Sequence, residues 1–220
     1  MRITYEHELQ ELNRELKEMS HRVANAIEQT FMAFVTENHA MAEEVIRGDR
    51  TINDMERTIE SRCLSLILKQ TPVAGDLRVV STALKVVTDL ERIGDHASDI
   101  AELIIRMHGD HVFELIPHLP IMANEAKEML RDSIEAFIAQ DDQLAETIVK
   151  RDDKVDQLFN QTKTDVAELL KTSKDTDTID NAIDLLMVAK YLERIGDHAV
   201  NICEWTQFSR TGAVKNVRIL

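Results

Sequence analysis

Apolar residues recur every three or four positions along most of the chain, which is the spacing of one buried face on an amphipathic helix. Leu9, Leu12 and Leu16 begin such a stripe between Glu6 and Val35. Proline is absent from residues 1–71 and 121–220, so long helices can run without interruption. The pattern predicts an all-α protein with six long helices at residues 6–35, 38–69, 76–108, 121–139, 141–170 and 178–208.

Side chains that cap helices stand before three of these segments. Asn38, Asp76 and Asp141 can each accept a hydrogen bond from the first backbone amides of the helix that follows. Gly109, Pro117 and Pro120 interrupt the pattern and mark a linker. We therefore expect two similar antiparallel three-helix bundles. The expected divisions are a first bundle at 1–108, a linker at 109–120, a second bundle at 121–209 and a frayed tail at 210–220.

The two halves are related by sequence. Residues 90–102 read LERIGDHASDIAE and residues 192–204 read LERIGDHAVNICE, with identity at ten of thirteen positions. A weaker echo relates residues 45–49 to residues 148–152. An internal duplication explains both similarities, and repeats of this kind usually form one structural unit each.

The duplicated segment carries acids on one helix face, because a turn of about 100° per residue brings these positions together. The first copy contributes Glu91, Asp95, Asp99 and Glu102, and the second contributes Glu193, Asp197, Asn201 and Glu204. A matching row in segment 38–69 consists of Asp49, Asn53, Glu56 and Glu60. Segment 141–170 keeps only Asp152 and Asp156, with Phe159 and Lys163 at the remaining positions. Facing rows would form oxygen-rich sites suited to hard cations or oxidised iron.

The alternative is that these rows are ordinary solvated acidic surfaces. Like charges four residues apart destabilise an isolated helix by roughly 0.2–0.5 kcal/mol per pair, so something should offset them. The acids at 91 and 193, and at 95 and 197, are the same in both copies, which favours a specific role. Gly94 and Gly196 also match, and a glycine inside a helix costs roughly 1 kcal/mol relative to alanine. Close helix packing and room for ions beside the acids are compatible explanations.

Composition narrows the function classes. The 40 acidic and 26 basic residues give a net charge of −14, which argues against unspecific nucleic-acid binding and favours cationic partners. Two distant cysteines fit a reducing compartment. No signal peptide or bilayer-spanning run is visible, so we expect a cytoplasmic protein without membrane insertion. The sequence contains no glycine-rich phosphate loop and no nucleophile elbow, which argues against the enzyme classes that use them. A ferritin-type di-iron site would need a second Glu-x-x-His pair besides Glu18 and His21, and the sequence has none.

These motifs resemble the PhoU family over nearly the whole chain. The markers are the doubled Glu-Arg-Ile-Gly-Asp segments at 91–95 and 193–197, the Gly-Asp pair at 48–49, the Asp-Leu-Arg sequence at 76–78 and the Asn-Ile-Cys-Glu sequence at 201–204. The resemblance implies two three-helix bundles side by side, usually in a homodimer and without enzymatic activity. It implies a negative regulator of the phosphate-starvation response and of phosphate uptake. Such proteins link the ATPase subunit of a phosphate ABC transporter to a membrane sensor histidine kinase, which would place this chain peripherally at the inner face of the membrane.

The resemblance also implies multinuclear metal clusters on the acidic helix faces. Carried over to this sequence, the first set of metal ligands is Asp49, Asn53, Glu56, Glu91, Asp95 and Asp99. The second set is Asp152, Asp156, Glu193, Asp197 and Asn201, which is poorer in carboxylates. Iron, zinc, magnesium and manganese are all candidates. Two rival interpretations are a metal-dependent helical enzyme or metal store, and a helical adaptor whose acids are merely solvated.

Overall fold

The computed structural model of the chain describes residues 2–70, 72, 74–109, 112–214 and 217–218. Six α-helices dominate this part: α1 (Arg2–Thr36), α2 (His39–Gln70), α3 (Ala74–Arg106), α4 (Leu119–Ala139), α5 (Asp142–Thr172) and α6 (Thr176–Thr211). A short 3₁₀ helix, η1 (Val112–Leu115), precedes α4. Strands β1 (Ala213–Val214) and β2 (Val217–Arg218) follow α6. The prediction of an all-α chain with six long helices is confirmed.

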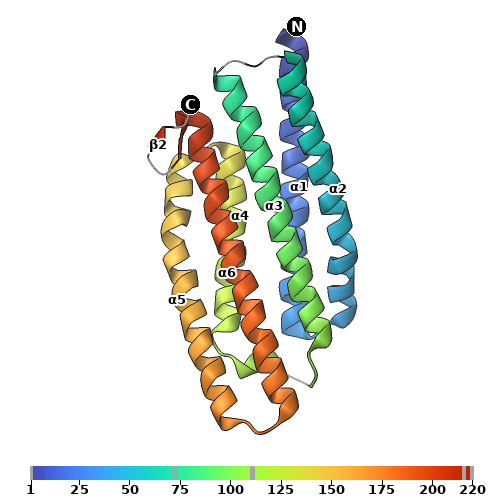
Figure 1. Cartoon of the computed structure of the whole chain (residues 1–220), viewed down its shortest axis with the longest axis vertical. Helices are drawn as coiled ribbons and strands as arrows, with labels where there is room; N and C mark the ends of the chain where they lie inside the picture. The colour runs from blue at the N-terminus through green and yellow to red at the C-terminus, as the bar shows by residue number, and fades with distance from the viewer. Residues whose placement is uncertain (1, 71, 73, 110–111, 215–216, 219–220) are drawn as a thin grey trace.

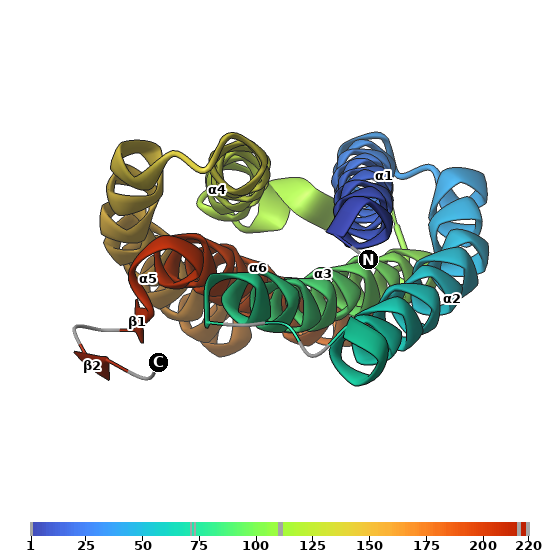
Figure 2. The same ribbon diagram turned by 90° about the horizontal axis from the view of Figure 1, so that it is seen from above.

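The helices form two similar bundles that lie side by side (Figure 1). In the end-on view of Figure 2, α3 and α6 lie together in the middle, α2 and α5 lie at the two outer edges, and α1 and α4 cover one side. The helix that carries the duplicated segment is therefore central in each repeat. No helix of the described residues is both long and apolar enough to cross a membrane.

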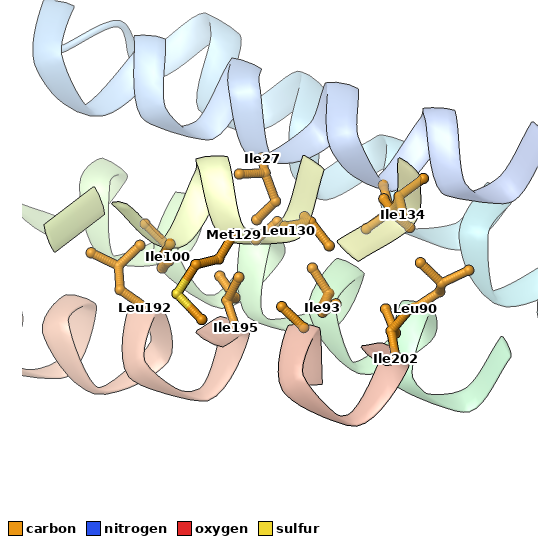
Figure 3. Close-up of a cluster of buried hydrophobic side chains, with 14 of the residues drawn as sticks. Ile27, Leu90, Ile93, Ile100, Met129, Leu130, Ile134, Leu192, Ile195 and Ile202 are labelled. Carbon is orange, nitrogen blue, oxygen red and sulfur yellow. The ribbon is translucent and has the colours of Figure 1, made fainter. Parts of the chain in front are cut away.

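One hydrophobic core runs through both bundles (Figure 3). Its centre is built from equivalent residues of the two copies, because Leu90, Ile93 and Ile100 of α3 recur as the buried Leu192, Ile195 and Ile202 of α6. Ile27 of α1 and Met129, Leu130 and Ile134 of α4 cover these pairs. Burying each such side chain contributes roughly 1.5–3 kcal/mol, so the two repeats stabilise one another.

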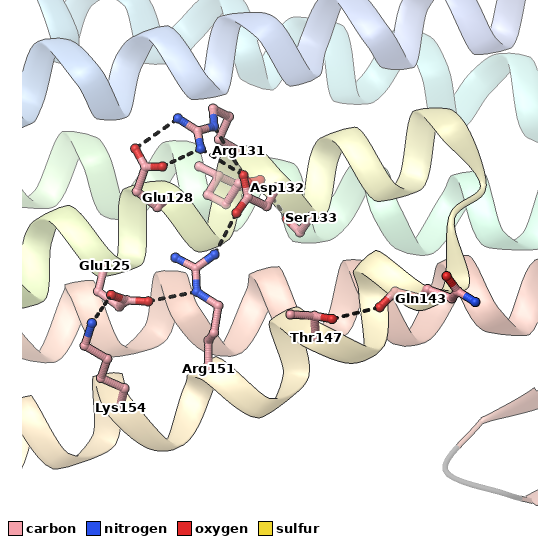
Figure 4. Close-up of polar contacts among 10 residues, drawn as sticks. Glu125, Glu128, Arg131, Asp132, Ser133, Gln143, Thr147, Arg151 and Lys154 are labelled. Carbon is pink, nitrogen blue, oxygen red and sulfur yellow. Dashed lines mark hydrogen bonds and ion pairs between the residues drawn. The ribbon is translucent and has the colours of Figure 1, made fainter.

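An arginine joins the outer helix to the first helix of each bundle. In the first repeat, Arg62 of α2 donates to both carboxylate oxygens of Glu15 at 2.8 Å and to Glu8 at 2.6 Å. In the second repeat, Arg151 of α5 donates to Glu125 at 2.8 Å and to Asp132 at 2.6 Å (Figure 4). These charge-assisted bonds hold α2 and α5 in place beside the central helices.

Two of the three predicted caps are present. Asn38 accepts a hydrogen bond from the Met41 amide at 3.1 Å, and Asp141 accepts from the amides of Gln143 and Leu144 at 3.0 Å each. The prediction that Asp76 caps a helix was wrong, because α3 begins earlier, at Ala74, and Asp76 lies in its first turn. An acid there still interacts favourably with the positive end of the helix dipole.

Described parts of the predicted linker and of the predicted tail form regular secondary structure. Part of segment 109–120 forms η1, and Leu119 and Pro120 already belong to α4, where proline at the start of a helix loses no internal hydrogen bond. The tail was expected to be frayed, but Ala213 pairs with Arg218 and Val214 with Val217 in an antiparallel ladder. Gly212, with φ of 72°, ends α6 and allows this turn.

Candidate metal-binding faces

The first acidic face lies between α2 and α3. The carboxyl groups of Asp49 and Glu56 on α2 are electrostatically coupled to Asp95 on α3, and Glu91 on α3 is coupled to both Asp49 and Glu56. The two helices therefore turn their predicted rows towards each other. Asn53 lies within the row on α2 and donates its amide to Asp49 Oδ2 at 3.0 Å. The geometry brings together five of the six residues predicted for this face.

Three buried oxygens on this face have no hydrogen-bond partner: Asp49 Oδ1, Asn53 Oδ1 and Glu91 Oε2. Buried polar atoms are normally paired, because leaving one unsatisfied costs roughly 1–3 kcal/mol. Arg92 compensates only part of the charge. Its guanidinium lies 3.5 Å from Glu91 and 3.3 Å from Asp95, and more than half of its side chain is exposed to solvent. The face is therefore short of positive charge.

The electrostatics of this face follow from burial and crowding. Burial raises the pKa of Asp49, and the neighbouring Asp95 raises it further. Burial, Asp95 and Glu56 raise the pKa of Glu91, while burial and Glu60 raise the pKa of Glu56. Asp49, Glu56 and Glu91 are thus harder to ionise here than in water, and a bound cation would favour their ionised forms.

Gly94 allows α2 and α3 to approach each other closely. A Cβ atom at this position would lie 3.1 Å and 3.2 Å from two side-chain carbons of Ile52, and 3.7 Å from Asp49 Oδ1. The close helix packing proposed for the glycine is therefore present at this position, and the room for ions beside the acids stays a prediction. The missing side chain of Gly94 permits close packing and keeps space beside an unpaired carboxylate oxygen.

The second acidic face lies between α5 and α6. Burial and the nearby Asp197 raise the pKa of Asp152 to about 6, and Asp156 and Glu193 add to this effect. Burial, followed by Glu193, also raises the pKa of Asp197. Gly196 mirrors Gly94, because a Cβ atom there would lie 3.3 Å from Asp152 Oδ1. The four predicted carboxylates of the second set thus face one another.

Lysine side chains lie beside this second face. Lys190 donates to Glu193 and lies 5.4 Å from the centre of the Phe159 ring, over which Lys163 also lies at 5.0 Å. The position of Lys190 is occupied by Thr88 in the first repeat. The ammonium groups of Lys190 and Lys163 reduce the electrostatic attraction of this face for a metal ion, so the second face is the weaker candidate for metal binding.

Asp99 and Asn201 occupy the edge of the two faces rather than their centre. Asn201 donates its amide to Asp89 of α3 at 3.1 Å, which turns it towards the contact between the bundles. Asp99 remains coupled electrostatically to Asp49, but it also lies 3.4 Å from Nδ1 of His96. The helical spacing predicted that both residues lie on the same helix face as the other acids. Their side chains instead follow the contacts that they make, Asn201 with Asp89 of the neighbouring helix and Asp99 with His96.

The contact between α3 and α6 contains the two histidines of the duplicated segment, together with Asp89 and Tyr191, which the sequence did not single out. His198 Nδ1 lies 2.8 Å from Asp89, and the rings of His96 and His198 have centres 5.7 Å apart. Tyr191 stacks on His96 at 5.4 Å, and burial lowers the pKa of that histidine. The retention of histidine at 96 and 198 in both copies was the available signal. Asp89 and Tyr191 occupy equivalent positions but differ between the copies, so the repeat offered no signal for either of them.

The residues of the first face fit an oxygen-preferring cation in their donor chemistry. They offer four carboxylates and one amide oxygen, and three of their buried oxygens are unpaired. Within the described residues, no three histidine, cysteine, aspartate or glutamate side chains already form a metal-coordinating group.

Comparison with known families agrees with the doubled architecture. The PhoU domain matches this chain twice, at residues 16–104 and 119–206. The first match ends within the carboxyl-terminal half of α3 and the second within that of α6. Each match thus contains one acidic face.

Relatives of known classification match almost the full length. The phosphate-specific transport system accessory protein PhoU homolog of Clostridium acetobutylicum is 38% identical over 209 residues, covering 94% of each chain. The phosphate-specific transport system accessory protein PhoU of Escherichia coli is 32% identical over 200 residues, which cover 90% of this chain and 81% of that one.

Solved structures show the same fold. The phosphate transport system regulatory protein PhoU from Streptococcus pneumoniae superposes with a TM-score of 0.85 at 28% identity, covering 96% of this chain and 98% of that one. PhoU from Pseudomonas aeruginosa gives the same TM-score at 29% identity, covering 95% of this chain and all of the other.

Proposed function

Because this chain belongs to the PhoU family, we propose that it represses the phosphate-starvation response and restrains phosphate uptake when phosphate is plentiful. The observation that carries the proposal is the near-complete match, in sequence and fold, to accessory and regulatory proteins of phosphate transport systems. The chain is a homologue of these accessory proteins, and the family is regulatory rather than enzymatic.

The proposed mechanism is protein–protein contact. The chain would bind the ATPase subunit of a phosphate ABC transporter and a sensor histidine kinase, and so convey the state of the transporter to the kinase. Its place would be the cytoplasm, at the inner face of the membrane through these partners, and its working form a homodimer. The fold supports this proposal because it consists of long rigid helices with two repeated faces, an arrangement suited to binding partners.

We further propose that metal ions bind the acidic faces, the first more tightly than the second. Asp49, Glu56, Glu91 and Asp95 would supply carboxylate oxygens, and Asn53 its amide oxygen. The bound cation would neutralise charges that oppose the approach of α2 to α3. The support is the set of unpaired buried oxygens on the first face and the presence of Lys190 beside the second.

The regulatory proposal is tested by deleting the gene and measuring a phosphate-starvation reporter in phosphate-rich medium. Expression should rise, and a plasmid copy of the gene should restore repression. A reporter that stays silent in the deletion strain contradicts the proposal.

The partner proposal is tested by affinity capture from solubilised membranes at high and low phosphate. The transporter ATPase and the kinase should be recovered, and recovery of neither would refute it.

The metal proposal is tested by elemental analysis of protein purified without a histidine tag. The unmodified chain should retain metal, and a Glu91→Gln, Asp95→Asn variant should retain much less. A Glu193→Gln, Asp197→Asn variant is the matched control and should lose less metal than the first variant. Metal contents near zero in all three proteins would refute the metal proposal and would mean that the acids form an ordinary solvated surface. This result would not affect the regulatory proposal, which the reporter tests separately. Turnover of a substrate or storage of many ions per chain would favour the rival interpretations.

A further inference from the structure

A pocket lies at the junction of the two repeats, away from both acidic faces. It is bounded by α1 and α3 of the first repeat and by α4 and α6 of the second, and its volume is about 290 Å³. Figure 2 looks onto this end of the molecule, where α1 and α4 stand apart above α3 and α6. A cavity of roughly 150 Å³ holds one benzene molecule, so this pocket has room for about ten to twelve non-hydrogen atoms.

The lining of this junction pocket combines apolar walls with a few hydrogen-bonding groups. The walls are formed by Leu16, Val79, Ala83, Phe137 and Ile138. The polar groups belong to Asn13, Lys17, Thr82, Gln140 and Ser209. This mixture is typical of sites for small organic molecules, where apolar surface supplies affinity and a few polar groups fix orientation.

Among the described residues that line the pocket, the one charged side chain is the cation Lys17, although the chain carries −14 overall. Lys17 forms no hydrogen bond or ion pair within the described residues, and none of the described residues that line the pocket is acidic. Two arginines hold the rim: Arg78 donates to the Ser209 carbonyl at 3.4 Å, and Arg210 donates to the Gln140 carbonyl at 3.3 Å while its charge is paired with Asp142 at 2.9 Å. An anion would therefore be favoured at the mouth of the pocket.

Thr82 brings an unpaired hydroxyl to the pocket wall. Its side chain is 2% exposed, and its Oγ1 has no hydrogen-bond partner. Such a group is costly when it stays unsatisfied. Threonine in a helix has two accessible χ1 rotamers, so a change from one rotamer to the other can turn the hydroxyl towards a molecule in the pocket. A ligand would give this hydroxyl the partner that the protein does not provide.

Gln140 closes the rim as the residue that ends α4. Its φ of 55° is the left-handed conformation common at helix C-termini, and Glu37 after α1 has a similar φ of 53°. Gln140 Oε1 accepts a hydrogen bond from the Ser209 hydroxyl at 2.7 Å, and its amide donates to the Phe137 carbonyl at 2.8 Å. These bonds join the end of α4 to α6, so the rim is organised before any ligand arrives.

We propose that the junction pocket binds a small organic monocarboxylate of about ten to twelve non-hydrogen atoms, most of them apolar. Lys17 pairs with the carboxylate, the Thr82 hydroxyl donates to it, and the apolar body lies against Leu16 and Phe137. A doubly charged inorganic anion fits less well, because the pocket offers one free ammonium group and a largely apolar wall. This inference goes beyond the proposed role in phosphate regulation and is independent of it.

The probe is 3-phenylpropionate, compared by calorimetric titration with its neutral amide and with inorganic phosphate. We expect saturable binding of the carboxylate with Kd of about 1 mM or tighter. The Lys17→Gln variant should weaken it about tenfold. The Thr82→Val variant should weaken it about fivefold while leaving the ligand-free unfolding midpoint unchanged or higher, because the unpaired hydroxyl is gone. Lys150→Gln, an exposed lysine on α5, is the control and should leave Kd unchanged.

Four results would overturn the proposal. The first is no saturable binding of 3-phenylpropionate up to about 10 mM. The second is equal affinity for the neutral amide, since the charge would then play no part. The third is that Lys17→Gln and Thr82→Val both bind as tightly as the unmodified chain. The fourth is phosphate binding that Lys17→Gln abolishes while the organic acid does not bind, which would assign the pocket to an inorganic anion.

Discussion

Substituting alanine for Gly94 tests whether the close approach of α2 and α3 sets the geometry of the first acidic face. Alanine is the better helix former and would by itself raise the free energy of unfolding by about 1 kcal/mol. The new Cβ would, however, lie 3.1 Å and 3.2 Å from two carbons of Ile52, well inside ordinary carbon–carbon contact. Overpacking of this kind destabilises by about 1–3 kcal/mol. The net expectation is a loss of about 0–2 kcal/mol.

Gly48 provides the matched control, because it lies exposed in the middle of α2 and a Cβ there would meet nothing within 4 Å. Gly48→Ala should therefore stabilise the protein by about 0.5–1 kcal/mol. Urea unfolding followed by circular dichroism, with chelator present, measures both variants. The two free energies of unfolding should differ by about 1–3 kcal/mol.

A double-mutant cycle identifies the contact responsible. In an Ile52→Ala background both clashing carbons are removed, so Gly94→Ala should become neutral or stabilising. The coupling energy between the two positions should then fall between about 0.5 and 3 kcal/mol. If Gly94→Ala stabilises the unmodified chain as much as Gly48→Ala does, the packing argument for the duplicated glycine is refuted.

Three further predictions concern other parts of the chain. Arg62→Gln should lower the free energy of unfolding by about 2–3 kcal/mol in urea titrations, because the guanidinium joins α2 to Glu15 through two hydrogen bonds of 2.8 Å. The stability of metal-free protein should fall as pH rises from 3.8 to about 6, because unfolded Asp152 has already ionised while the folded group still holds its proton. Urea midpoints at about pH 4.5 and about pH 7.5 should show this difference, and Asp152→Asn should reduce it. Burial raises the pKa of Cys63 and Cys203 to about 12, so mass spectrometry should find neither alkylated by iodoacetamide at neutral pH until the chain unfolds.

Much of the fold followed from local sequence because the physical causes are local. Apolar stripes determine helix faces, and Asn38 and Asp141 stabilise helix starts through bonds to amides two or three residues away. The prediction for Asp76 failed because an acid near the start of a helix has two possible roles. It can cap the helix from outside, or it can interact with the helix dipole from within the first turn, as Asp76 does. The short strand pair after Gly212 has too little apolar alternation to be read from sequence.

The candidate site was predictable only in part, because contacts between helices are not local. Helical spacing placed Glu193, Asp197 and Asn201 on one arc, yet Asn201 turns to Asp89, which precedes it by 112 residues. The facing of α2 against α3 was expected from the family resemblance rather than from the spacing of the acids, and the carboxylates of Asp49 and Glu91 do interact electrostatically. The stacking of Tyr191 on His96 could not be found, because no repeat or spacing relates these two residues.

The fusion of two repeats into one polypeptide has a consequence that a symmetric pair of identical subunits would not share. In such a pair, every substitution appears twice, so both acidic faces would change together. Here Lys190 and Lys163 accompany only the second face, while Thr88 holds the position equivalent to Lys190 beside the first. If both faces bind a cation as proposed, divergence within the fused chain allows two affinities for it, and hence a response spread over a wider range of concentration than one class of site gives.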